Sequence, residues 1–285
     1  MGKRLELIRL ILIISFLSLF PVSLLAQSST SSQSAVIGNL RFNYESVDWE
    51  YREFTGSGDE LMKDYGKLTG FSSELQGQVG FLQLTSSYRY LSGSTRYEGG
   101  LQDSNGNYAG DYDTDSKNKI VNYELGIHRV YDIGAGQVWT MGIGYYIRKL
   151  DNPELPSDPY DYSRYATYKT IPFTLKYVNK SFDFFRFEAI AKLHTFFKGE
   201  TDTRSSEVNP ESTDVVFQQP NGRGLELKLN SFFNTGYGRL MFGAYGTFWS
   251  VEDSDYEPVP GSDSLIRYEP ENKTSVIGFN VGLAY

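Results

Sequence analysis

The chain has 285 residues, no cysteine, 28 glycines, 15% aromatic residues and a formal net charge of −8. Without cysteine the fold cannot depend on disulfides, and an acidic surface repels the phosphates of nucleic acid, which excludes nucleic acid as a partner. An aromatic-rich and glycine-rich composition is typical of a transmembrane β-barrel, in which only alternate residues of a strand meet lipid, although a large soluble β-sandwich can share it.

The first 26 residues have the pattern of a secretory signal peptide. A basic head precedes an apolar run at 10–20, and Ala26 offers a small residue for cleavage. The alternative, an uncleaved anchor, needs about 20 apolar residues, and this run is shorter. We therefore expect export of the chain, a flexible periplasmic lead-in at 27–35 and a barrel at 36–285.

Ten stretches with strand-like alternation follow, with almost no helical periodicity. They lie at 36–52, 67–77, 81–96, 118–131, 138–150, 165–178, 182–198, 222–233, 239–251 and 272–285. The connections alternate between short and long, and the long ones lie at 53–67, 97–117, 150–164, 199–222 and 252–272. Short turns on one side and long loops on the other are typical of outer-membrane barrels. The prediction is an all-β, up-and-down antiparallel transmembrane barrel of about ten strands with five long extracellular loops, monomeric, in a bacterial outer membrane.

The last stretch alternates strictly and ends on an aromatic ring. Its apolar face comprises Ile277, Phe279, Val281, Leu283 and Tyr285. Because lipid offers no partner to a bare peptide group, a sheet in the membrane must close, so this strand is expected to pair with the first. The pattern resembles the terminal signal that outer-membrane proteins present to the barrel-assembly machinery, a predicted partner. The alternative is an ordinary edge strand, but an exposed apolar edge favours aggregation in a soluble protein.

Residues opposite the apolar faces are predicted to line the lumen as an ion-pair network. They are Arg41, Glu45, Glu74, Arg89, Glu124, His128, Arg148, Lys176, Arg186, Glu188, Lys192, His194, Glu226 and Lys228. Eight strands leave an interior filled by side chains, and buried charges are costly unless paired, so we expect a narrow, ion-paired lumen. A small selective channel is the first alternative. The histidines are expected to join the hydrogen-bond network, and the alternative is a ligand or proton-relay role.

The five long connections hold 25 acidic and 6 basic residues, which predicts an acidic crown at the outer end. Such a crown attracts divalent cations or basic segments of partner proteins. Alternatively, the acidic residues only keep the surface soluble among lipopolysaccharide. Membrane lipid and lipopolysaccharide are the expected surroundings of the barrel.

One connection also carries a partial metal motif. Asp111, Asp113 and Asp115 have the spacing of the first half of a calcium loop. Ser116 and Asn122 stand where that loop needs a glycine and a bidentate glutamate. Calcium is the one cofactor that the sequence suggests.

Strand count, loop rhythm and chain length resemble the omptins, a family of outer-membrane proteases, over the mature chain. The resemblance implies a water activated by two Asp residues in the second loop and an Asp–His pair in the fourth. The second loop offers Asp111, Asp113 and Asp115, whereas the fourth has Asp202 and Asp214 but no His. A general base near neutral pH is most often His, so no catalytic residue is predicted. A non-enzymatic role at the surface is expected, with an omptin-like protease as the second alternative.

Overall fold

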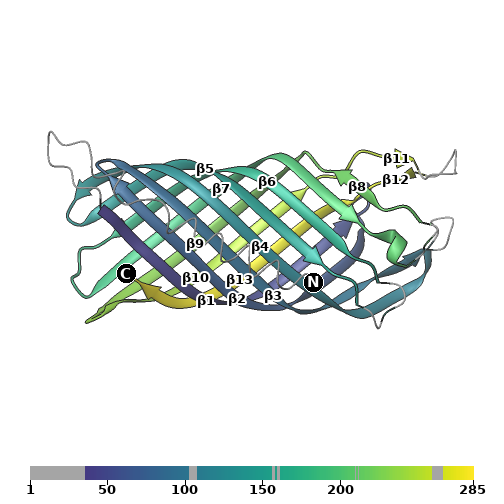
Figure 1. The fold of residues 1–285 in the computed structure, drawn as a ribbon, viewed down its shortest axis with the longest axis horizontal. Coiled ribbons are helices and arrows are strands. Elements are labelled where there is room, and N and C mark those ends of the chain that lie inside the picture. Colours follow the sequence, from purple (N-terminus) through teal and green to yellow (C-terminus); the bar gives the residue numbers. More distant parts are fainter. Residues whose placement is uncertain are drawn as a thin grey trace.

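The computed structural model describes residues 36–102, 108–155, 158, 161–208, 210, 212–258 and 266–285. It shows a closed antiparallel barrel of tilted strands, which confirms the predicted fold class (Figure 1). The strands are β1 (Val36–Phe54), β2 (Glu60–Val79), β3 (Leu82–Gln102), β4 (Tyr108–Gly134), β5 (Gln137–Asn152), β6 (Arg164–Asn179), β7 (Phe185–Thr203), β8 (Val215–Gln218), β9 (Gly222–Thr235), β10 (Gly238–Val251) and β13 (Glu271–Ala284). The expected signal peptide and lead-in lie outside the described residues.

The ring closes where the first strand, β1, pairs with the last, β13. Consecutive strands pair around the barrel, and β1 pairs with β13 without interruption from Arg41↔Ala284 to Phe54↔Glu271. The backbone groups of Leu40 and Tyr285 add two hydrogen bonds, of 3.1 and 2.9 Å, at the end of this seam. Both β8 and β9 pair with β7, so together they follow one strand path, and ten paths complete the ring.

Several strands extend into segments that the sequence assigned to long loops. β2 begins at Glu60, which leaves only residues 55–59 in the first connection. β3 and β4 stay paired up to Leu101↔Gly110 and, after a register shift, Gln102↔Tyr108, so most of the second connection is a strand hairpin. A strand above the membrane meets water and needs no apolar face, so alternation of hydrophobicity does not reveal it. The described parts of the long connections also hold short elements, namely β8, a 3₁₀ turn (Ser205–Glu207) and the paired strands β11 (Glu257–Pro258) and β12 (Ile266–Arg267). No helix among the described residues is long and apolar enough to span a membrane.

An apolar belt surrounds the barrel on the outside. On β13 the five residues of the predicted apolar face point outward, with 41 to 70% of their surface exposed. β10 carries aromatic residues on both faces, so alternation of the sequence does not distinguish them; the strand directs Phe242 and Phe248 outward and Met241, Tyr245 and Trp249 inward. An outward run of nine residues spans roughly 27 Å along a strand and about 20 Å along the barrel axis, close to the height of a lipid-facing band.

Basic side chains form a girdle on the outer wall beyond this belt. Each lies one to four residues beyond an outward apolar side chain of the belt: Lys67, Lys119, Lys149, Lys169, Lys198, Arg223 and Lys273. At the opposite, short-turn end, the exposed rings include Phe81, Phe182, Phe184, Tyr237 and Tyr285. The belt between these two borders is the part of the wall that fits a membrane.

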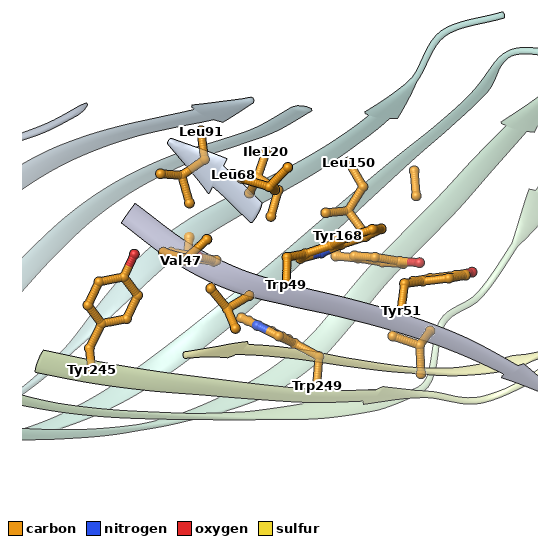
Figure 2. Close-up of a cluster of buried hydrophobic side chains, with 14 of the residues drawn as sticks. Val47, Trp49, Tyr51, Leu68, Leu91, Ile120, Leu150, Tyr168, Tyr245 and Trp249 are labelled. Atoms are coloured by element: carbon orange, nitrogen blue, oxygen red, sulfur yellow. The ribbon is translucent and has the colours of Figure 1, made fainter. Parts of the chain in front are cut away.

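The hydrophobic core lies inside the barrel, toward the outer half. Figure 2 shows Val47, Trp49, Leu68, Leu150 and Trp249 pointing toward one another in the interior. All the buried residues of this cluster expose 9% or less of their surface. We call this cluster the apolar plug, because it fills the lumen with side chains at that level.

Candidate functional site

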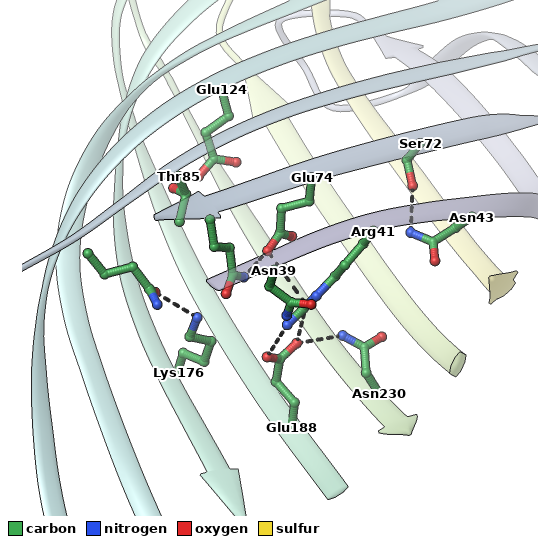
Figure 3. A network of polar contacts seen from close by, with 12 residues as sticks. Asn39, Arg41, Asn43, Ser72, Glu74, Thr85, Glu124, Lys176, Glu188 and Asn230 are labelled. Atoms are coloured by element: carbon green, nitrogen blue, oxygen red, sulfur yellow. Dashed lines mark hydrogen bonds and ion pairs between the residues drawn. The ribbon is translucent and has the colours of Figure 1, made fainter. Parts of the chain in front are cut away.

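A first group of charges lies in the lumen toward the short-turn end. Arg41 donates to Glu188 through both terminal nitrogens, from Nη1 to Oε1 at 2.8 Å and from Nη2 to Oε2 at 2.9 Å (Figure 3). Glu74 lies 3.5 Å from Nη1 of Arg41, and Asn230 donates to Glu188 at 2.9 Å. Arg41 exposes 1% of its surface and Glu188 none. This pairing of planar groups, with further hydrogen bonds around it, is the arrangement that makes a buried charge tolerable.

A second group lies between the first and the apolar plug. Arg89 contacts Glu45 at 3.0 Å and Glu226 at 3.5 Å. Lys192 contacts Glu124 at 2.5 Å and Glu226 at 3.5 Å. Arg186 lies 3.4 Å from Glu188 of the first group. Counting Arg186, nine of the fourteen predicted lumen residues therefore form ion pairs with one another.

The other three lumen cations have partners of different kinds. Lys176 donates to Gln83 at 2.9 Å, and Lys228 lies 6.0 Å from the ring centre of Tyr245. Arg148 lies over the ring of Trp249 at 4.9 Å, inside the apolar plug. For Arg148, the partner is therefore an aromatic ring in a cation–π contact and not the carboxylate that a fully ion-paired lumen would provide.

Both histidines lie in the interior and contact threonine. His128 Nε2 is 2.9 Å from the Thr85 hydroxyl, and His194 Nδ1 is 3.1 Å from the Thr170 hydroxyl. His194 also packs against Trp249, with 4.6 Å between ring centres. Neither histidine is among the residues that line the large cavity at the outer end.

That cavity, which we call the vestibule, opens above the apolar plug. It has a volume of about 1000 Å³, and Trp49, Leu150 and Ala166 of the plug form part of its wall. Its other aromatic lining residues are Tyr51, Tyr97, Tyr112, Tyr162, Phe217 and Tyr268. Six acids line it, Glu53, Glu60, Asp64, Asp111, Asp161 and Glu269, against two bases, Arg164 and Arg267. At the level of the vestibule the outer wall carries charged side chains such as Lys63, so the vestibule lies beyond the apolar belt.

Arg164 holds two of these acids together. Its Nη2 donates to both Glu53 and Glu269, and the Tyr51 hydroxyl donates to Glu53 at 2.9 Å. The pKa of Glu269 is raised to about 7, because burial and the nearby charge of Glu53 together outweigh the opposing effect of Arg164. Three charged groups thus form one nearly buried cluster in the wall of the vestibule.

The aspartates of the partial calcium motif lie on β4, where Asp113 and Asp115 face outward and Asp111 lies at the rim of the vestibule. Asp111, Asp113 and Asp115 occupy alternate positions of a continuous strand, and Arg96 pairs with Asp113 and Asp115. Among the described residues, no group of three or more His, Cys, Asp or Glu side chains is placed to hold a metal ion. Calcium binding here stays a prediction, and titration of the wild type and of an Asp113→Ala variant would test it.

The vestibule residues were not singled out from the sequence, although a signal existed. Alternation that places Glu74 inside also places Asp64 inside, provided that β2 is extended beyond residue 67. The same extension of β1 carries the inward face from Glu45 to Glu53. Because residues 53–67 were assigned to a loop, no face was given to them.

Comparisons with known proteins agree with the fold. No family model and no curated protein sequence matches the chain. The outer-membrane protease OmpT from Escherichia coli superposes with a TM-score of 0.56 at 9% identity, over 90% of this chain and 99% of OmpT. Ail from Yersinia pestis (TM-score 0.30, 9% identity, 88% of this chain and 100% of Ail) and the toluene transporter TodX from Pseudomonas putida (0.29, 12%, 88% and 90%) superpose too poorly to support an argument. The architecture is therefore that of the omptin-like ten-stranded outer-membrane barrels, as the resemblance implied, and activity does not follow from it.

Proposed function

We propose that the protein is an integral outer-membrane barrel of a Gram-negative bacterium that catalyses no reaction and binds cations or basic segments of partner proteins in its vestibule. The observation that carries this proposal is the lining of the vestibule, with six acids against two bases in a cavity of about 1000 Å³. A recess lined by one sign of charge between low-dielectric walls concentrates ions of the opposite sign.

The membrane location is supported by the outer wall. The apolar belt fits the hydrocarbon layer, and an aromatic border at the short-turn end is usual for such barrels. The basic girdle at the other border suits the phosphate groups of lipopolysaccharide, because Lys and Arg pair with phosphate oxygens. Lipid and lipopolysaccharide are therefore the proposed surroundings of the barrel.

A binding role is favoured over the two alternatives for different reasons. A channel would need a path through the apolar plug, where Leu68 and Val251 are fully buried and Leu91 exposes 1%. An omptin-like protease would need a general base at the vestibule, and no His lines the described part of it. In addition, Asp202 and Asp214 of the fourth connection both pair with Arg204.

The proposal is tested with the mature barrel refolded in detergent micelles. Fluorescence anisotropy of a labelled hexalysine peptide should show binding that weakens as salt is raised, whereas a hexaglutamate peptide should not bind. Equal binding of both peptides would refute the proposal. Steady nanosiemens openings in a planar bilayer would favour the channel, and cleavage of a dibasic fluorogenic peptide would favour the protease.

A further inference from the structure

One acid of the vestibule differs from the others in its surroundings. Asp64, on β2, exposes only 2% of its surface and nevertheless lines the cavity. Its Oδ2 accepts a hydrogen bond of 2.7 Å from Asn118 Nδ2, while its Oδ1 is buried without a hydrogen bond. Among the ion pairs of the described residues, none includes Asp64, whereas Glu53 and Glu269 share Arg164. A buried carboxylate oxygen with no donor is costly, so a ligand that supplies one would gain affinity.

The neighbours of Asp64 fix its carboxylate without neutralising it. Asn118 Nδ2 also donates to Thr95 Oγ1 at 2.8 Å, which locks the amide that orients Oδ2. Burial raises the pKa of Asp64, while the polar groups of Thr95, Asn118 and Ser116, and the more distant charge of Arg164, favour the charged form. The polar neighbours carry no charge and Arg164 pairs with Glu53 and Glu269, so a cation that pairs with Asp64 directly must come from outside the group.

The walls beside Asp64 are aromatic and apolar. Tyr51 and Tyr97 are its direct partners on the two flanking strands, and Met62 precedes it on the same inward face. All four residues line the vestibule. A carboxylate flanked by rings suits an ammonium group on an alkyl stem, because the ring faces attract the cation and the stem contacts their apolar surface.

We propose that Asp64 is the anchor for the ammonium group of a small aliphatic amine that enters the vestibule. This inference rests on the proposed function and names the ligand class of the same cavity. A small molecule is favoured over a lysine of a polypeptide because the accessible part of Asp64 is narrow, at 2% exposure, and because about 1000 Å³ is within the range of small-molecule sites.

The experiment is isothermal titration of the refolded mature barrel with putrescine, spermidine and n-butylamine as probes. The wild type should bind the amines, and Asp64→Asn, which keeps the size and one oxygen, should bind them about ten- to a hundredfold more weakly. Asp48→Asn is the matched control, because Asp48 is an exposed aspartate on the outer face of β1 and should leave the affinity unchanged. A shift of apparent molecular mass on heating, seen by gel electrophoresis, checks that each variant folds.

The outcomes separate this inference from the proposed function. If Asp64→Asn binds amines as well as the wild type does, Asp64 is not the anchor, and cation binding by the vestibule stands. If hexalysine binds and no amine does, the small-amine inference is refuted and the proposed function stands. If neither hexalysine nor any amine binds, both are refuted.

Discussion

The ion pair between Arg41 and Glu188 gives the sharpest test of how the lumen is stabilised. We expect Arg41→Met to lower the free energy of unfolding by about 3 kcal/mol, because it leaves a buried carboxylate without its main partner. Breaking a buried pair in this way costs roughly 3–5 kcal/mol in general. Glu188 keeps a hydrogen bond of 2.9 Å from Asn230 and an ion pair of 3.4 Å with Arg186, which places the expected loss at the lower end.

Reversible unfolding in denaturant, followed by tryptophan fluorescence in detergent micelles, measures this loss. Arg52→Met is the matched control, because Arg52 pairs with Glu50 at 2.9 Å but both side chains are about one-third exposed. An exposed pair contributes at most about 1 kcal/mol, so this variant should be nearly as stable as the wild type.

The double variant Arg41→Met with Glu188→Met separates the pair from its surroundings. Removing both charges leaves no unpaired carboxylate at position 188, so most of the stability lost in Arg41→Met should return. The reasoning is supported if the double variant loses less stability than the sum of the losses of the two single variants. The reasoning is refuted if Arg41→Met costs no more than Arg52→Met, or if the losses of the two single variants simply add.

Three further changes test other parts of the structure. The pKa of Glu269 is raised from 4.5 to about 7, mainly by burial, so between these pH values the native state holds a proton that the unfolded state releases. The free energy of unfolding should therefore fall as pH rises through this range. Denaturation measured at several pH values should show a smaller fall for Glu269→Gln. Gly282→Val should reduce the yield of folded barrel in gel-shift assays, since a Cβ there would lie 2.1 Å from the Phe42 carbonyl across the closing seam, whereas Gly77→Val, with nothing within 4 Å, should fold normally. Tyr285→Ala should lower assembly into the outer membrane of cells but not refolding in micelles, because the Tyr285 ring is 58% exposed and its backbone bonds to Leu40 remain; equal losses in both assays would contradict a role in recognition by the assembly machinery.

The fold could be predicted because lipid imposes a simple rule on a barrel. Along β13, Ile277 and Phe279 face outward while Asn280 lies inside, and a period of two residues is enough to read this. The rule fails where lipid ends. β2 and β4 begin at Glu60 and Tyr108, in segments that the sequence assigned to loops, since water on both sides removes the need for an apolar face.

The partners inside the lumen could not be predicted from alternation. Arg41 and Glu188 are 147 residues apart, and their contact depends on the stagger between strands on different sides of the ring. The apolar plug was missed for a related reason. Trp49 lies on the face of β1 that was expected to be polar. Trp249 lies on β10, whose faces alternation did not distinguish because both carry aromatic residues.

The order of the layers along the barrel supports the proposal that the vestibule is the binding site. In the lumen, acids such as Glu188 and Glu226 are matched by Arg and Lys, so their fields largely cancel within the barrel. The apolar plug then separates these pairs from the vestibule, where acids outnumber bases. A cation drawn from the medium would therefore meet an excess of acids and, directly behind them, a largely apolar wall in which Arg148 adds a positive charge. We expect such an arrangement to retain a cation at the outer end of the barrel instead of passing it inward, which favours the proposed binding role over transport.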